Sequence, residues 1–197
     1  MKMSWLALGA LTLAGILGSP RPAAADWTIY GGNPEHQLFT NEKVTAPLGV
    51  LWRHTTNVYS KQGNVGGPVI QEGTVYFPSK NFIHAVDAAS GELKWKAPEG
   101  DESDPNIPRI SATPVINGDL LYVPQSDGAL RVYNATNGQT ITTFKTGGEI
   151  RCSPTLVGNR LYFGSDDDYL YCLDADNLSL VWKGSMDGRN ASKLTDD

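Results

Sequence analysis

The sequence predicts an all-β fold, namely a partial β-propeller built from four-stranded blades. Three copies of one pattern carry this prediction, because they begin about 40 to 46 residues apart, which is the period of a propeller blade. After residue 25 the apolar residues alternate or run in short bursts between Gly, Pro, Asn and Asp, so no helical periodicity remains. The copies begin at Gly67-Pro68, Thr113-Pro114 and Ser153-Pro154.

Each copy predicts the same elements in the same order. A turn glycine follows the proline, and a strand of apolar-Tyr-apolar sequence, a polar hairpin turn, a third strand and a closing strand come after it. The turn glycines are Gly73, Gly118 and Gly158, and the tyrosine strands are Val75-Tyr76-Phe77, Leu121-Tyr122-Val123 and Leu161-Tyr162-Phe163. The hairpin turns span residues 79–81, 126–128 and 165–168, and the third strands span residues 83–87, 130–134 and 170–174.

The closing strands carry a tryptophan in two copies. Trp95 and Trp182 end them, whereas the second copy has Thr142 at that position. Trp52 precedes Pro68 much as Trp95 precedes the next proline, so residues 26–60 are interpreted as a partial N-terminal blade, and residues 26–33 as a strand that pairs elsewhere in the ring. A blade exposes both faces, so we expect these large, rigid side chains to dock one blade on the next. About three full repeats plus this partial blade predict an incomplete ring.

The first 25 residues predict a secretory signal peptide. Lys2 supplies the positive charge, residues 5–17 are apolar, and Ala23-Ala24-Ala25 offers a cleavage site. A membrane anchor is the weaker reading, because a spanning helix needs roughly 20 apolar residues. We therefore expect residues 26–197 to form a soluble, secreted propeller segment, in the bacterial periplasm or outside the cell, with no membrane anchor.

Charge narrows the classes of partner. The formal net charge is −5, and no run of Lys and Arg is present. Nucleic acids and anionic membranes need basic patches that displace counterions, so neither is expected as a partner.

A family resemblance follows from the residues around the tryptophans. Residues 85–95, with Ala85, Asp87, Gly91 and Trp95, resemble the tryptophan-docking motif A-x-D-x-x-T-G-K-x-x-W of pyrroloquinoline-quinone (PQQ) repeat propellers. Residues 172–182 are similar but have Leu178 where the motif has glycine, and residues 132–138 keep the turn but are followed by no tryptophan. The chain is thus identified as a member of the PQQ-like repeat propeller family.

The resemblance implies one of two functional classes. Quinoprotein dehydrogenases of this family hold PQQ and calcium above the propeller and oxidise alcohols or sugars, with a ring disulfide between adjacent cysteines. Non-catalytic members, such as the periplasmic lipoprotein that assists outer-membrane β-barrel assembly, bind protein. This chain has no adjacent cysteine pair. We therefore favour the non-catalytic class and expect no cofactor. An N-terminal fragment of a PQQ-dependent dehydrogenase, with PQQ and calcium, is the alternative.

The cysteines and the acidic run are interpreted as structural. By repeat alignment Cys152 and Cys172 lie two strands apart, about 9.6 Å, beyond the roughly 7 Å Cα limit of a disulfide. We therefore favour two free thiols, with Cys172 in the core. A disulfide remains the alternative, because secreted proteins fold in an oxidising environment.

The acidic run is interpreted as a turn. Residues 166–168 are all aspartate and occupy a hairpin, where Asp suits the turn geometry; a calcium site is the alternative interpretation. Asp87, Asn134 and Asp174 recur at one repeat position and are expected to cap turns.

Two arginines break the repeat and form the candidate binding site. Arg109 and Arg151 lie shortly before Pro114 and Pro154, in connections that should crowd around one mouth of the channel. Two guanidinium groups there would bind a carboxylate or an acidic peptide, although Glu149 offers one of them a local partner. The insertion at residues 101–108 is expected at the same face.

Together these features predict a secreted scaffold that binds a protein or peptide. No catalytic, cofactor-binding or metal-ligating residue is expected, and open blade edges allow self-association. Closure of a half-ring by dimerisation is a further alternative.

Overall fold

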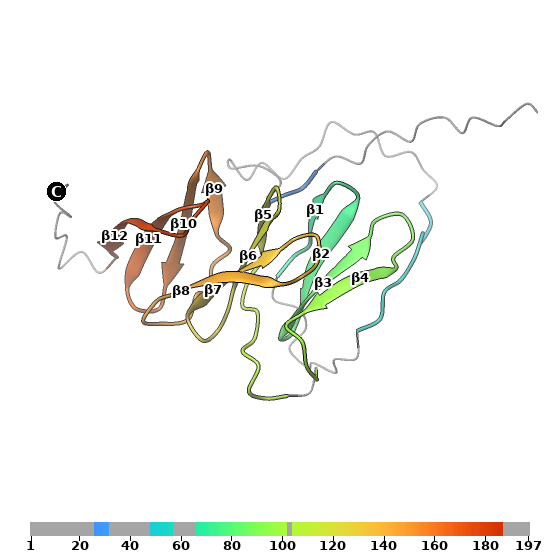
Figure 1. The fold of residues 1–197 in the computed structure, drawn as a ribbon, viewed down its shortest axis with the longest axis horizontal. Coiled ribbons are helices and arrows are strands. Elements are labelled where there is room, and N and C mark those ends of the chain that lie inside the picture. Colours follow the sequence, from blue (N-terminus) through green and yellow to red (C-terminus); the bar gives the residue numbers. More distant parts are fainter. Residues whose placement is uncertain (1–25, 32–47, 57–65, 102–103, 187–197) are drawn as a thin grey trace, which may run out of the picture.

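Three four-stranded antiparallel sheets make up the fold. The computed structural model describes residues 26–31, 48–56, 66–101 and 104–186, and these residues contain strands and no helix. In each sheet the strands follow one another in chain order, and the sheets themselves lie side by side in chain order (Figure 1). This is the arrangement of consecutive propeller blades, so the predicted all-β partial propeller is confirmed. In the described ranges no helix is long and apolar enough to cross a bilayer.

Each blade is a meander with a short innermost strand. Blade 1 consists of β1 (Val69–Gln71), β2 (Thr74–Ser79), β3 (Phe82–Asp87) and β4 (Leu93–Ala97). Blade 2 consists of β5 (Val115–Asn117), β6 (Leu120–Pro124), β7 (Ala129–Asn134) and β8 (Thr140–Lys145). Blade 3 consists of β9 (Thr155–Val157), β10 (Arg160–Ser165), β11 (Tyr169–Asp174) and β12 (Leu180–Ser185). The predicted tyrosine strands and third strands all fall inside these elements.

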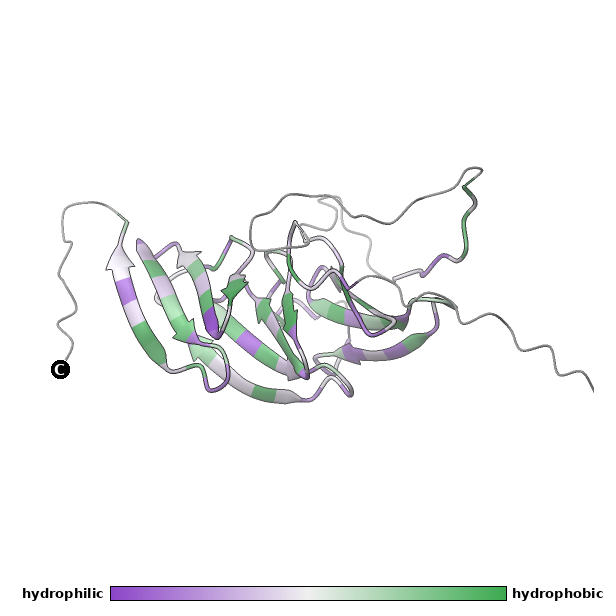
Figure 2. Cartoon of the chain, turned by 90° about the horizontal axis from the view of Figure 1, so that it is seen from above, coloured by the Kyte–Doolittle hydropathy of each residue, from purple (hydrophilic) through white to green (hydrophobic). Residues whose placement is uncertain are grey.

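The core lies between the blades. We call the side of a blade that packs on the following blade its trailing face, and the opposite side its leading face. Strand residues alternate between the two faces, and apolar residues recur along the strands of all three blades (Figure 2). The trailing face of blade 1 and the leading face of blade 2 share one buried cluster, which includes Tyr76, Ala85, Ile116, Leu121 and Tyr133. The trailing face of blade 2 and the leading face of blade 3 share another, which includes Tyr122, Val132, Leu161, Phe163 and Leu173.

The residue before each repeat proline links neighbouring blades near their innermost strands. The Gly67 N–H donates to the hydroxyl of Thr113 at 2.8 Å, and the Thr113 N–H donates to the hydroxyl of Ser153 at 3.1 Å. Proline itself has no N–H to offer. The hydroxyl residues of two starting dipeptides therefore act as inter-blade acceptors.

The N-terminal stretch differs from its prediction. Residues 26–31 form no strand of another blade; instead a single antiparallel bridge joins Trp27 to Ile70 of β1. The Thr28 carbonyl accepts a hydrogen bond from the Ile116 N–H of blade 2 at 2.9 Å, and Ile29 is 3% exposed in the second core cluster. The stretch pairs here because the innermost strands present a free edge. Residues 32–47 and 57–60 of the predicted partial blade lie outside the described residues, as does the predicted signal peptide.

Candidate functional site

The candidate site lies where the connections that precede β5 and β9 meet the hairpins of the blades. The Ser126 N–H, in the β6–β7 hairpin, donates to the carbonyl of Arg109 at 2.8 Å. The Asp166 N–H, in the β10–β11 hairpin, donates to the carbonyl of Glu149 at 2.9 Å. Each connection is thus fixed by backbone to the hairpin of the blade that it enters.

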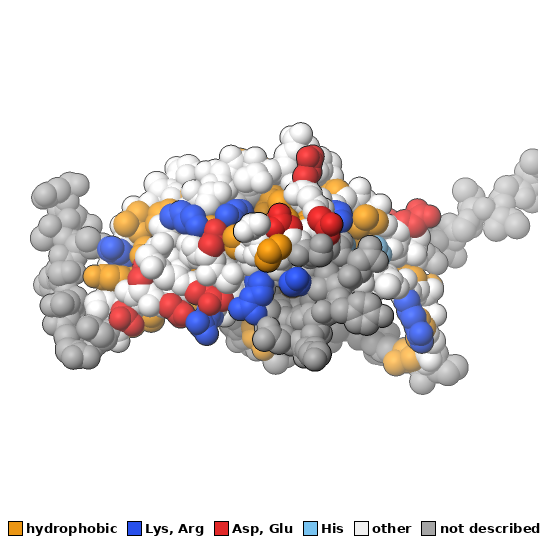
Figure 3. All heavy atoms as spheres, turned by 90° about the horizontal axis from the view of Figure 1, so that it is seen from below, with side chains coloured by type: hydrophobic (Ala, Val, Ile, Leu, Met, Phe, Trp, Pro, Cys, Tyr) orange, Lys and Arg blue, Asp and Glu red, His pale blue; other side chains and the backbone are white. Residues whose placement is uncertain are grey.

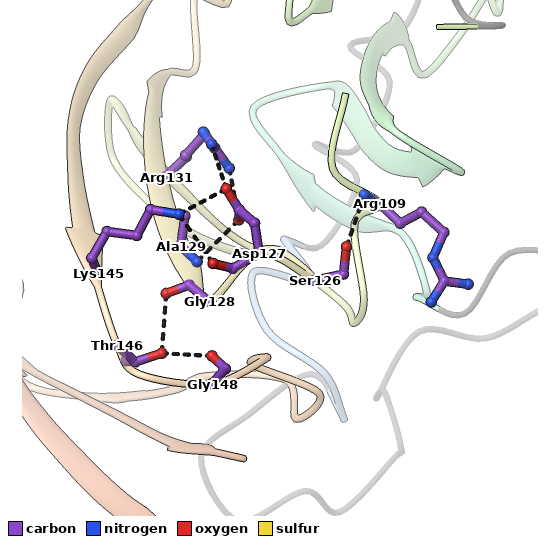
Figure 4. Close-up of polar contacts among 9 residues, drawn as sticks. All are labelled: Arg109, Ser126, Asp127, Gly128, Ala129, Arg131, Lys145, Thr146 and Gly148. Carbon is purple, nitrogen blue, oxygen red and sulfur yellow. Dashed lines mark hydrogen bonds and ion pairs between the residues drawn. The ribbon is translucent and has the colours of Figure 1, made fainter. Parts of the chain in front are cut away.

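These bonds show that the two candidate arginines hold different repeat positions. Arg109 corresponds to Glu149, and Arg151 lies two residues further along its connection. Arg109 is held by the hairpin of blade 2, and its own N–H donates to the Ser126 hydroxyl at 3.1 Å. Its exposed side chain extends away from the cluster around Asp127 (Figure 4). Arg151 is held at the hairpin of blade 3.

Arg151 is engaged by two carboxylates. Its Nε donates to Asp166 Oδ2 at 2.6 Å, and its second guanidinium nitrogen lies 3.2 Å from Glu149 Oε2. The hydrogen bond to Asp166, together with the charges of Asp166 and Glu149, raises the pKa of the guanidinium. The local partner anticipated for one arginine is therefore present, and the positive charge of Arg151 is balanced within blade 3.

A charge cluster that sequence reasoning missed lies at the β6–β7 hairpin. Asp127 accepts hydrogen bonds from Arg131 at 2.8 and 3.2 Å, from Lys145 at 2.8 Å and from the Ala129 N–H at 3.1 Å (Figure 4). Partial burial would raise the pKa of Asp127, but the bonds from Arg131 and Lys145 outweigh it and lower that pKa to about 2. The sequence signal was the spacing of Asp127 and Arg131, four residues apart, whereas Lys145 is brought to Asp127 only by the β7–β8 register, in which it lies opposite Ala129.

The acidic run forms a hairpin turn, as the repeat alignment predicted. Asp167 accepts hydrogen bonds from the Gly147 N–H at 2.7 Å and the Tyr171 hydroxyl at 2.6 Å. Burial opposes ionisation of Asp167, yet these bonds lower its pKa. Asp168 takes the left-handed backbone conformation, with φ of 67°. In the described part of the chain, no group of three or more His, Cys, Asp or Glu side chains is arranged to hold a metal ion.

The aspartates of this face do not fit a calcium ion. A calcium ion needs several carboxylate or carbonyl oxygens, whereas Asp127, Asp166 and Asp167 are already bonded to Arg131, Arg151 and Tyr171. Arg151, one of the two candidate arginines, is already paired with two carboxylates. These three aspartates and Arg151 are thus already bonded to neighbouring side chains.

The insertion in the first repeat interval walls a hollow against blade 2. Asn106, Ile107 and Pro108 line a cavity of about 250 Å³ together with Gln125 and Tyr133. Gln125 is 1% exposed, and its Oε1 accepts no hydrogen bond within the described residues. Buried amide oxygens are normally paired, so Gln125 carries an unsatisfied acceptor beside this hollow.

The tryptophans lie at blade junctions. Trp95 Nε1 donates to the carbonyl of Ala135 at 2.8 Å, and Trp52 Nε1 donates to the carbonyl of Ala88 at 2.9 Å. Each ring lies against a glycine of the following turn, Trp95 on Gly138 and Trp52 on Gly91. Trp182 takes the corresponding place on the trailing face of blade 3, beside Tyr162.

The junction between blades 2 and 3 uses a different pair. Register places Thr142 opposite Val132 as Trp95 stands opposite Ala85. Leu178 stands where the other turns have Gly91 and Gly138, and it shares their left-handed conformation, with φ of 57° against 74° for both glycines. Its side chain is 7% exposed within the core cluster of this junction. A missing tryptophan on one blade thus coincides with an added side chain on the next.

The remaining sequence predictions concern turns and thiols. The predicted caps are confirmed, because Asp87, Asn134 and Asp174 each accept hydrogen bonds from two backbone N–H groups of the following turn. Cys172 is 1% exposed, which confirms its core position. Cys152 is exposed, and its Sγ accepts a hydrogen bond from the Gly164 N–H of β10 at 3.0 Å. Cys172 lies in β11, on the opposite side of β10.

Comparison with known proteins gives one family match and several partial relatives. A family model described as "Outer membrane protein assembly factor BamB" matches residues 5–148. Tetrathionate hydrolase of Acidithiobacillus ferrooxidans is 29% identical over 206 residues, covering 89% of this chain and 38% of the relative. Methanol dehydrogenase (cytochrome c) subunit 1 of Methylorubrum extorquens is 22% identical over 201 residues, covering 86% of this chain and 31% of the relative.

Two solved structures share the fold. Quinohemoprotein alcohol dehydrogenase from Comamonas testosteroni superposes with a TM-score of 0.65 at 19% identity, covering 82% of this chain and 27% of that chain. BamB from Moraxella catarrhalis superposes with a TM-score of 0.51 at 20% identity, covering 61% of this chain and 37% of that chain. The chain therefore spans less than two fifths of the length of each of these relatives.

Proposed function

The chain belongs to the PQQ-like repeat β-propeller family, and on this basis we propose that it is a non-catalytic scaffold that binds a protein or peptide. We place it, with its predicted signal peptide removed, in the periplasm or outside the cell. No nucleic acid, membrane anchor or cofactor is part of this proposal.

One observation carries the proposal: the polar groups of the hairpin face are bonded to one another. The two carboxylates of this face with shifted pKa values, Asp127 and Asp167, are both shifted downwards, so each is held as an anion by its neighbours. A general base works best with a pKa near the operating pH, and these groups are far from it. Such a network suits a rigid surface that presents fixed contacts.

Two features of that surface support a polypeptide partner. Arg109 places an exposed cation at the hairpin face, and Gln125, whose buried Oε1 accepts no hydrogen bond within the described residues, lines the neighbouring hollow. On the side of the molecule drawn in Figure 3, acidic and basic side chains are interspersed rather than gathered by sign. Protein interfaces combine apolar contacts with a polar rim, and the hollow is lined by both apolar and polar side chains, among them Ile107, Pro108 and Asn106. Arg151 contributes to binding where a partner carboxylate replaces Glu149 or Asp166.

Binding of an acidic peptide at Arg109 is testable with a fluorescein-labelled glutamate-rich decapeptide in fluorescence anisotropy. We expect saturable binding that Arg109→Gln weakens about tenfold, the loss of one charge-assisted contact. The matched control is Arg160→Gln, which removes an arginine that pairs with Asp174 at the far end of β10. Equal binding by wild type and Arg109→Gln would remove Arg109 from the site.

The second candidate function is the N-terminal part of a PQQ-dependent dehydrogenase. The TM-score of 0.65 to a quinohemoprotein alcohol dehydrogenase over 82% of this chain favours it. Under this alternative, blades that the partial ring lacks supply the groups that hold PQQ and calcium. The two functions differ in one measurable property, which is stoichiometric binding of the cofactor.

A further inference from the structure

The trailing face of blade 3 presents an unused docking pair. The ring centroids of Tyr162 and Trp182 lie 6.1 Å apart with an interplanar angle of 52°. Tyr76 and Trp95 on the trailing face of blade 1 lie 5.8 Å apart at 48°. Around the blade 3 pair, Leu170 and Met186 are 38% and 55% exposed. Blade 3 therefore carries the same aromatic arrangement as blade 1, on a surface that the described residues leave open.

The blade 1 pair shows what such a face binds. Tyr76 and Trp95 both donate to the carbonyl of Ala135, at 3.2 and 2.8 Å. The Trp95 ring lies so close to Gly138 that a Cβ there would be 2.6 Å from its Cε3. The occupant of this kind of face is thus a capped turn with an accessible carbonyl and a left-handed residue that has no side chain.

Among the described residues, one turn meets those requirements and is not covered by a blade. Gly138 is already covered by Trp95 of blade 1, and the third turn carries Leu178 in place of glycine. The blade 1 turn has Gly91 with φ of 74° and the Ala88 carbonyl as acceptor. It matches the Gly138 turn in conformation and is capped from the same repeat position, by Asp87 where the Gly138 turn has Asn134.

The Gly91 turn is covered by Trp52, which belongs to no strand. A Cβ on Gly91 would be 2.6 Å from Trp52 Cδ2, the same close approach as at Gly138. Residues 48–56 are without regular structure, and Leu48, Val50 and Leu51 are 76%, 69% and 72% exposed. This segment therefore caps the leading face of blade 1 while most of its apolar residues face solvent.

We propose that the trailing face of blade 3 in one copy of the chain binds the Gly91 turn of a second copy and displaces Trp52. Trp182 then takes the place of Trp52, with its Nε1 donating to Ala88 and its ring on Gly91. The contact is head-to-tail, so it closes into a ring or extends as a chain of copies. Trp52 acts as an internal competitor that limits this association. The inference does not depend on the proposed partner.

The test is sedimentation velocity over a range of protein concentration, with the full chain and four variants. Trp52→Ala removes the competitor, so its association should strengthen about tenfold, as expected when a blocked binding state becomes fully available. Trp52→Phe keeps most of the packing but loses the Nε1 donor, and it should lie between wild type and Trp52→Ala. Trp182→Ala and the double variant Trp52→Ala with Trp182→Ala should remain monomeric.

A matched control separates this site from general loss of apolar surface. Ile141→Ala shortens a 50% exposed side chain on β8 of the middle blade, and its association should equal that of wild type. Far-UV circular dichroism checks that each variant is folded. The inference is overturned if folded Trp52→Ala and Trp52→Phe associate no more than wild type. It is also overturned if the double variant associates as strongly as Trp52→Ala, because the contact then does not use Trp182.

Discussion

Trp95 lies directly on Gly138, across the junction of blades 1 and 2. A methyl group at Gly138 would come within 2.6 Å of Cε3 and 2.9 Å of Cδ2 of the ring. The same indole donates to the Ala135 carbonyl three residues earlier in that turn. A glycine and a carbonyl on one blade are thus recognised together by one side chain on another.

The close approach makes Gly138→Ala costly. Gly118 is the matched control, because its φ of 56° is also left-handed but nothing lies within 4 Å of a Cβ built there. Gly118→Ala should lower the free energy of unfolding by about 1 kcal/mol, the cost of a left-handed alanine. Gly138→Ala should cost about 1 to 3 kcal/mol more, from overpacking against Trp95. Urea denaturation measures both, and equal losses would mean that the indole moves aside freely.

Thr142 and Leu178 should depend on one another, because they stand where the junction of blades 1 and 2 has Trp95 and Gly138. Leu178→Gly loses a buried leucine side chain, about 2 to 4 kcal/mol, and regains about 1 kcal/mol from the left-handed backbone. Thr142→Trp alone should be destabilising, because the ring meets Leu178. The two together should restore the arrangement of Trp95 and Gly138, with a coupling energy above about 1 kcal/mol. The control is Thr143→Trp, at the neighbouring position of β8, combined with Leu178→Gly. If the effects of Thr142→Trp and Leu178→Gly on the free energy of unfolding simply add, the pairing is contradicted.

The inter-blade tyrosines should differ in importance. The Tyr122 hydroxyl donates to the Ala175 carbonyl at 2.7 Å, without a tryptophan beside it, whereas Ala135 keeps the bond from Trp95 when Tyr76 is changed. Tyr122→Phe should therefore cost about 1 to 2 kcal/mol and Tyr76→Phe about 0.5 kcal/mol, because only the first leaves a buried carbonyl without its donor. Thermal unfolding of the two variants gives the comparison. A larger loss for Tyr76→Phe would contradict it.

Asp127 should make stability depend on acid pH. Its folded pKa is lowered to about 2 from 3.8, so its contribution is complete above its unfolded pKa and is lost as pH falls through the folded value. The difference in unfolding free energy between wild type and Asp127→Asn should therefore shrink by about 2 kcal/mol between about pH 5 and about pH 2. Urea titrations across this range measure it. A difference that stays constant with pH would show that Asp127 has an ordinary pKa.

Most of the fold was predictable from the sequence repeat, because every copy contains the same strands, turns and capping position. The caps at Asp87, Asn134 and Asp174 followed from their recurrence alone. Features that depend on cross-strand register were harder to predict. The bond between Asp127 and Lys145 joins residues 18 apart, and the exchange of Thr142 and Leu178 relates different blades. The bridge of Trp27 to β1 required knowing which edge was free.

The scaffold account is tested most directly by titration of PQQ into the purified chain in the presence of calcium. The titration is followed by isothermal calorimetry and by the absorbance of the quinone, with dye-linked alcohol oxidation as the activity assay. The account predicts no stoichiometric binding and no oxidation, because Asp127 is already bonded to Arg131 and Lys145, and Asp166 to Arg151, within the hairpin face. Binding of one PQQ per chain, with calcium dependence, would contradict the account and support the dehydrogenase.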